Sequence, residues 1–131
     1  MNDKFRIVTC CLLVSAMLLT AGCGGSDKET YGSDSFAMKS ALSTVDLLQS
    51  VLPAKNPYDL NGYSNSVSAS LRSVIPIVPS AAGKAKVQKA SEEFDKDMLP
   101  ALQSGQYDPA AMSKKLDGIK ALLQEVSKEV K

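Results

Sequence analysis

Histidine and tryptophan are missing from this chain, and only three of its 131 residues are cysteines. Aromatic residues make up 5% of the sequence. The 15 basic and 14 acidic side chains leave a net charge of +1, so the chain lacks the strongly basic field that proteins use to bind nucleic acid. Without histidine, the usual histidine-dependent serine or cysteine catalytic site cannot form. We therefore expect no nucleic-acid partner and no enzyme of that class.

Charge is also missing from a stretch near the N-terminus. Residues 7–22, "IVTCCLLVSAMLLTAG", carry no charged side chain and follow a basic start that contains Lys4 and Arg6. A basic start, an apolar run and small residues at its end are typical of a secretory signal peptide. Sixteen helical residues span only about 24 Å, less than the hydrocarbon core of about 30 Å. The pattern therefore favours a signal peptide over a transmembrane helix.

The end of this run, "LTAGC" at residues 19–23, resembles the lipobox of bacterial lipoproteins. The small residues Ala21 and Gly22 match that family's cleavage site, whereas Thr20 stands where leucine is usual. The resemblance covers residues 1–23 and implies cleavage between Gly22 and Cys23. It also implies that Cys23 receives a diacylglycerol thioether, and two or more acyl chains anchor a protein stably to a lipid bilayer. The alternative is an ordinary signal peptide with an incidental cysteine near its cleavage site.

The resemblance has consequences for cysteine chemistry and location. Cys10 and Cys11 would leave with residues 1–22, and Cys23 would be alkylated. The mature chain would then contain neither a free thiol nor a histidine, so the usual ligands of zinc, haem and copper are absent and no cofactor is expected. The expected location is the cell envelope, with the anchored protein facing the periplasm or the exterior.

The sequence divides into three parts. Residues 24–34, "GGSDKETYGSD", contain three glycines and no apolar periodicity, which indicates a flexible tether. Fully extended, these residues reach about 36 Å. The expected organisation is a signal peptide at 1–22, the lipidated cysteine and tether at 23–34, and a helical domain at 35–131.

Hydrophobic spacing from residue 35 onwards predicts an all-α fold, a compact bundle of three to four helices. The first helix ends at Pro53 and has one apolar face, which consists of Met38, Ala41, Val45, Leu48 and Leu52. Turn residues indicate a loop over 53–62. Residues 64–75 fit a short helix or a strand. We prefer the helix because the other periodic segments are helical and leave a strand without a partner.

Two longer helices are predicted further along the chain. Residues 80–104 form the third, which should kink or restart near Leu99 because Pro100 has no amide proton to donate. Gly105 is expected to end this helix. Asp108 followed by Pro109 is a strong start signal for a fourth. Its apolar residues recur in steps of four and three, namely Met112, Leu116, Ile119, Leu123, Val126 and Val130.

Three lysines near the start of the third helix and four acidic residues further along it, with Lys96 among the acids, are arranged opposite to what the helix dipole favours. These seven residues are Lys84, Lys86, Lys89, Glu92, Glu93, Asp95 and Asp97. They are either a charged face balanced by neighbouring helices and water, or a two-signed surface that docks on a partner. A carboxylate metal site is less favoured because nothing supplies a second, facing set of ligands.

Two local features have more than one interpretation. Gly118 lies in mid-helix, where glycine costs about 1 kcal/mol relative to alanine, and it either allows another helix to approach closely or is simply tolerated. Residues 59–65, "DLNGYSN", resemble a calcium loop in composition. Gly62, however, follows Asp59 by three residues instead of five, so we expect a turn and helix cap.

These observations favour a non-enzymatic role, in which a membrane-anchored lipoprotein binds another envelope protein or supports an assembly. The alternative is a small-ligand or peptide binder whose bundle contains a cavity beside the Pro100 kink. An exposed apolar or two-signed patch would favour the first function. A concave apolar pocket would favour the second.

Overall fold

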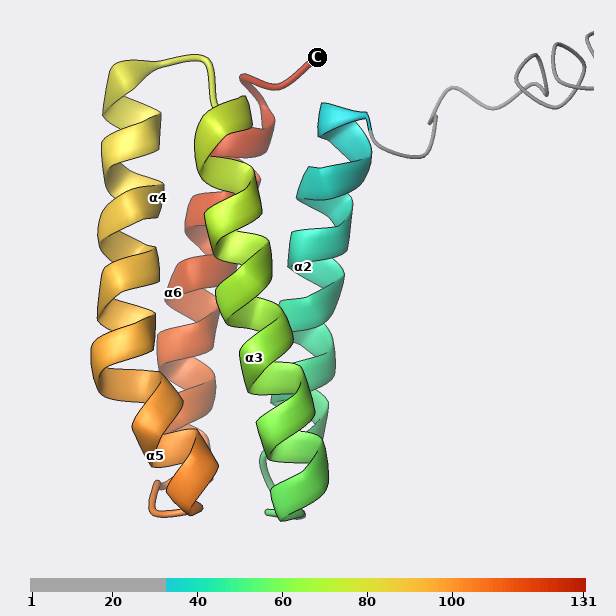
Figure 1. Ribbon diagram of the computed structural model, residues 1–131, viewed down its shortest axis with the longest axis vertical. Coiled ribbons are helices and arrows are strands. Elements are labelled where there is room, and N and C mark those ends of the chain that lie inside the picture. Colours follow the sequence, from blue (N-terminus) through green and yellow to red (C-terminus); the bar gives the residue numbers. More distant parts are fainter. Residues whose placement is uncertain (1–32) are drawn as a thin grey trace, which may run out of the picture. The chain divides into compact units, whose positions relative to one another are not determined.

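The computed structural model of the chain describes residues 33–131, which form a four-helix bundle with no strand in that range (Figure 1). The chain divides into two units, Met1–Thr30 and Tyr31–Lys131, and all described residues belong to the second. The predicted all-α bundle is confirmed. The predicted signal peptide and Cys23 lie outside the described residues.

The first helix of the bundle, α2 (Asp34–Val51), begins where the sequence predicts. The Ser33 hydroxyl accepts a hydrogen bond from the amide of Phe36 at 3.2 Å and caps the helix. The helix packs against both α3 and α6, which its wide apolar stripe requires. Its buried side chains belong to Met38, Ala41, Val45 and Leu48.

The second helix, α3 (Pro57–Val74), begins earlier than predicted. The side chain of Asn56 accepts hydrogen bonds from the amides of Tyr58 and Asp59. Pro57 occupies the first turn, where its missing amide proton costs nothing. The chain therefore enters a helix at the residues where the sequence suggested a loop.

This early start corrects two expectations. The predicted loop over 53–62 is too long, because only residues 52–56 connect α2 to α3. The turn and cap expected over 59–65 is also wrong, because these residues lie inside α3. The choice of helix over strand for 64–75 is confirmed as far as Val74.

The third helical stretch contains a π-helical segment before its proline. A short 3-10 turn, η1 (Ile75–Ile77), connects α3 to α4 (Ala81–Glu93). The chain continues through the π-helical segment η2 (Phe94–Met98) into α5 (Leu99–Ser104). The amide of Leu99 donates to the carbonyl of Phe94, five residues back, and this wider turn precedes Pro100, whose ring and missing donor disturb a regular helix. Of the predicted kink or restart near Leu99, the structure shows a restart, because α5 begins at Leu99 directly after the π-helical segment.

The connection to the last helix follows the sequence signals. Gly105 ends α5 in the left-handed conformation, with φ of 71°. The carboxylate of Asp108 accepts a hydrogen bond from the amide of Ala111 at 2.8 Å and so caps α6 (Pro109–Ser127). The first turn of α2 and the last turn of α6 lie at the same end of the bundle (Figure 1). The buried residues of α6 are the predicted Met112, Leu116, Ile119, Leu123 and Val126.

All four helices contribute to one hydrophobic core, in which Phe94 is the largest fully buried side chain. Burial of a valine, leucine or phenylalanine side chain contributes roughly 1.5–3 kcal/mol each. Within residues 33–131, every buried side-chain nitrogen and oxygen has a hydrogen-bond partner. None of the helices in this range is both long enough and apolar enough to cross a bilayer.

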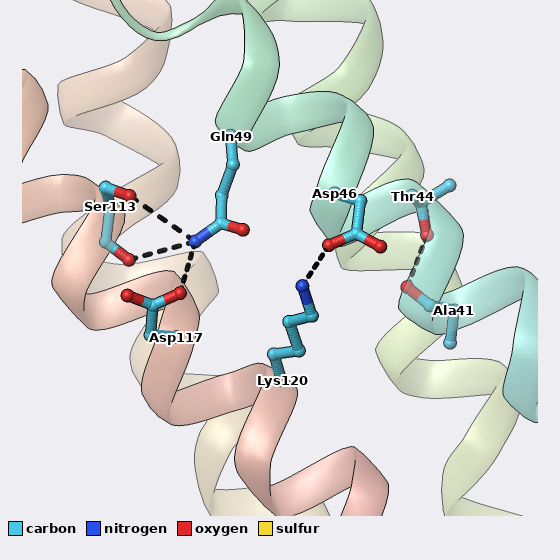
Figure 2. A network of polar contacts seen from close by, with 7 residues as sticks. All are labelled: Ala41, Thr44, Asp46, Gln49, Ser113, Asp117 and Lys120. Carbon is cyan, nitrogen blue, oxygen red and sulfur yellow. Dashed lines mark hydrogen bonds and ion pairs between the residues drawn. The ribbon is translucent and has the colours of Figure 1, made fainter.

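A polar seam joins α2 to α6 (Figure 2). The side-chain amide of Gln49 donates to the carboxylate of Asp117 at 2.8 Å and to the carbonyl oxygen of Ser113 at 3.1 Å. Lys120 forms an ion pair with Asp46, one turn before Gln49 on α2. These contacts fix the position of α6 along α2.

Candidate functional site

An open groove of about 490 Å³ lies between α4 and α6. It extends along α4 into η2 and is lined from both helices. Its apolar lining consists of Ala90, Phe94, Met98, Ile119 and Leu122. Charged side chains of both signs line it as well, namely Lys86, Lys89, Glu93, Asp97 and Lys115.

The groove exists because small residues occupy the facing sides of the two helices. Ala90 contributes only a methyl group on α4, and Gly118 contributes no side chain on α6. A Cβ atom placed at Gly118 would meet nothing within 4 Å. Within the described chain no helix approaches Gly118. The interpretation that Gly118 lets another helix of the bundle approach closely is therefore wrong. The missing side chain leaves the groove open.

The structure divides the seven charged residues predicted as a partner surface. Lys86, Lys89, Glu93 and Asp97 line the groove together. Lys84 and Glu92 are exposed but do not line it, and Glu92 accepts a hydrogen bond from Gln88 on its own helix. Asp95 contacts α3 instead. The two-signed surface therefore contains four of the predicted residues and excludes Asp95.

An ion pair crosses from α4 to α6 at one end of the groove. The Nζ atom of Lys86 lies 2.9 Å from Oε1 of Glu125. This hydrogen bond raises the pKa of Lys86 and lowers the pKa of Glu125. On the α4 side, Lys89 lies 3.8 Å from Glu93, one turn away. Both pairs are exposed to solvent, so each contributes little to stability, and their charges stay accessible.

Asp95 joins α3 to the π-helical segment on the other side of α4. Its carboxylate accepts hydrogen bonds from the hydroxyl of Ser68 and the guanidinium of Arg72. Partial burial raises the pKa of Asp95, but the hydrogen bonds from Ser68 and Arg72 outweigh this effect and hold the pKa below its ordinary value. Asp95 therefore has a structural role as the anion between two helices.

We expect Asp95→Asn to lower the free energy of unfolding by about 1–2 kcal/mol at pH 7, because the hydrogen bonds to a charged group are weakened. The folded-state pKa is lowered, so the stabilisation is present above the unfolded pKa of about 3.9 and is lost as the pH falls through the folded value. Urea unfolding between pH 7 and pH 2 should show the gap between wild type and variant closing below about pH 4. A gap that stays constant down to pH 2 would contradict this role.

The matched control is Asp97→Asn, two residues further along the same segment. Asp97 is exposed, and no hydrogen bond or ion pair to it is present in the described part of the chain. Its amide variant should stay within about 0.5 kcal/mol of wild type, as is usual for such surface sites. A comparable loss in both variants would show that the effect is not specific to Asp95.

On the α6 side of the groove, Gly118 is the one lining residue to which the sequence analysis gives a possible role. Lys115, Gly118 and Leu122 line the groove. With Glu125 at its end they recur at steps of three, four and three, which is a helical line beside the core stripe. The spacing alone could have shown that these residues share one face of α6. That this face lies beside α4 is known only from the packing of the two helices. Within residues 33–131, no group of three or more histidine, cysteine or acidic side chains is placed to hold a metal ion.

Comparison with protein-family models, curated proteins and solved structures found no match. Inference about function therefore depends on the groove and on the residues around it.

Proposed function

We propose that this protein is a lipid-anchored, non-enzymatic protein of the cell envelope whose bundle binds another protein through the α4–α6 groove. The groove is the observation that carries the proposal, because it combines an apolar lining with charged side chains of both signs. Apolar contacts at the centre of an interface supply affinity, and charges around them set orientation. The expected partner surface has an apolar side chain flanked by acidic and basic groups.

The proposed anchor supports a binding role. A diacylated Cys23 would hold the bundle near the bilayer through residues 24–34, and confinement raises the effective concentration of partners in the same membrane. Even a modest interface would then be occupied. The absence of histidine and the net charge of only +1 support a role without the usual catalytic groups and without nucleic acid.

A second candidate function follows from the size of the groove. Its volume of about 490 Å³ falls within the range of roughly 300–1,000 Å³ found for small-molecule sites. Phe94 and Met98 of the π-helical segment line it close to Pro100, where a cavity was expected. A peptide or apolar small molecule could therefore occupy the groove instead of a folded partner.

We expect the full chain in cell membranes to form protein adducts when a photo-crosslinking residue replaces Lys89 at the groove. A fatty-acid analogue should label the same chain. Cys23→Ser should abolish the label and reduce the adducts at least tenfold, because confinement to the membrane is lost. Gel mobility of the adducts and label incorporation are the two measurements.

Two glycine substitutions provide a matched control. Gly118→Leu should place a side chain in the groove and remove the adducts without removing the label. Gly62→Leu should leave both unchanged, since Gly62 also meets nothing within 4 Å but does not line the groove. A label that persists in Cys23→Ser would contradict the anchor. Adducts that persist in Gly118→Leu would contradict the groove as a protein site, and a melting temperature raised by an apolar compound would then favour the second candidate.

A further inference from the structure

The charges on the α4 side of the groove change sign halfway along the helix. Lys86 and Lys89 come first, and Glu93 and Asp97 follow. The inner pair, Lys89 and Glu93, and the outer pair, Lys86 and Asp97, are both centred on residues 91–92. A second copy of α4, turned end over end about this centre, would place a carboxylate opposite each lysine and a lysine opposite each carboxylate.

The α6 side of the groove has the same kind of symmetry. Lys115 and Glu125 have opposite charges and lie five residues on either side of Lys120. Gly118 and Leu122 lie two residues on either side of it. The same end-over-end rotation would therefore place Lys115 opposite Glu125, and the large side chain of Leu122 opposite the missing side chain of Gly118.

One axis can serve both sides, because the two centres lie at the same height in the bundle. α4 and α6 are antiparallel (Figure 1), and the 2.9 Å ion pair places Lys86 level with Glu125. Five residues further along α4 is Ser91, and five residues back along α6 is Lys120. A single two-fold axis, perpendicular to the helices and lying in the plane of contact, therefore crosses the centres of both lines.

We infer that the protein seated on the groove is a second copy of this chain, an inference that rests on the proposed function and names its partner. In this two-fold pair, Leu122 of each copy fills the open space at Gly118 of the other. Three kinds of ion pair form twice across the axis, namely Lys86 with Asp97, Lys89 with Glu93, and Lys115 with Glu125. The contact is isologous, so it closes with two copies.

The pair should be weak in solution and populated in a membrane. The side chains of Lys89 and Glu93 are 77% and 62% exposed, and those of the paired Lys86 and Glu125 are 56% and 60% exposed. All four can therefore exchange or share their contacts within one copy with contacts across the axis. Ion pairs that stay exposed to solvent contribute little each, so the interface is a modest one. Confinement by an anchor compensates for a modest interface, and salt should weaken the pair.

The test uses the full chain in cell membranes with a photo-crosslinking residue at Glu92, an exposed residue beside the groove at the height of the axis. An adduct of twice the chain's mass is expected. Lys89→Glu alone, or Glu93→Lys alone, places like charges opposite each other at two positions, so the adduct should fall at least fivefold. The combined Lys89→Glu and Glu93→Lys variant restores opposite charges across the axis and should restore the adduct.

Variants at the proposed packing contact provide a second test. Leu122→Ala and Gly118→Leu should each reduce the double-mass adduct at least fivefold, whereas Gly62→Leu should leave it unchanged; circular dichroism verifies that each variant is folded. A double-mass adduct that ignores the charge substitutions would overturn the two-fold arrangement. An adduct with a different protein that disappears in Gly118→Leu would overturn the second copy as partner and leave the proposed function standing. If the folded wild-type chain forms no adduct at all, both the second copy as partner and the proposed function are overturned.

Discussion

Phe94→Ala is expected to lower the free energy of unfolding by about 3–5 kcal/mol, the range measured for large aromatic truncations in cores. Phe94 is the largest of the fully buried side chains and begins the π-helical segment. The carbonyl of Phe94 accepts the π-type hydrogen bond from the amide of Leu99, which limits how far the backbone can move to close the cavity. For a domain with a typical stability of about 5–15 kcal/mol, this loss is a large fraction of the total.

Urea unfolding followed by circular dichroism measures this loss. The matched control is Tyr58→Ala, which removes an aromatic side chain that is 86% exposed and should change stability by less than about 0.5 kcal/mol. A loss below about 1 kcal/mol for Phe94→Ala would be too small for a core aromatic residue and would contradict the position of Phe94 at the centre of the core.

Gly83→Ala should destabilise the bundle by about 1–3 kcal/mol, although alanine is the better helix former. A Cβ atom at Gly83 would lie 2.7 Å from Cγ1 of Val78 and 2.8 Å from Oγ of Ser80. Val78 is fully buried and has few alternative rotamers. The hydroxyl of Ser80 caps α4 by accepting a hydrogen bond from the amide of Gly83 at 3.0 Å, and loss of such a cap costs about 1 kcal/mol.

Replacement of Gly118 by alanine should change the stability of the bundle in the opposite direction. Nothing lies within 4 Å of a Cβ atom there, so Gly118→Ala gains helix propensity without strain and should stabilise the bundle by about 0.5–1 kcal/mol. Thermal unfolding of the two alanine variants, compared with wild type, measures both effects. Stabilisation by Gly83→Ala would show that the segment before α4 moves aside at little cost.

The parts of the fold that depend on local signals were predictable. Asp108 and Pro109 start α6, and Gly105 ends α5, because capping and turn conformations are decided by a few neighbouring residues. Asn56 and Pro57 carry the same kind of start signal for α3. Asparagine and proline are also frequent in turns, and together with Gly62, which lowers helix propensity, they favour a loop over 53–62. Burial of Leu60 and Ser64 against the core outweighs that propensity in the folded chain.

The candidate site was predictable only in part. Asp95 lies two residues from both Glu93 and Asp97, and residues two apart do not share a helix face, so spacing could have separated Asp95 from the surface. The groove itself depends on which helices are neighbours and on how far each is displaced along the other. The pairing of Lys86 with Glu125 decides that displacement. No local sequence pattern contains this information, because the two residues are 39 positions apart.

The first turn of α2 lies at one end of the bundle (Figure 1), so in the inferred pair the first turns of the two copies point to opposite ends. The 18 residues of α2 extend about 27 Å. With the anchor proposed at Cys23, residues 24–34 would have to reach the bilayer from both ends of the pair, and they span at most about 36 Å when fully extended. A pair standing upright on the bilayer would use most of this reach at its far end, whereas a pair with its helices along the membrane surface would not. If Cys23 is lipidated as proposed, we therefore expect the pairs to lie flat on the bilayer, each covering it with the long side of its bundle.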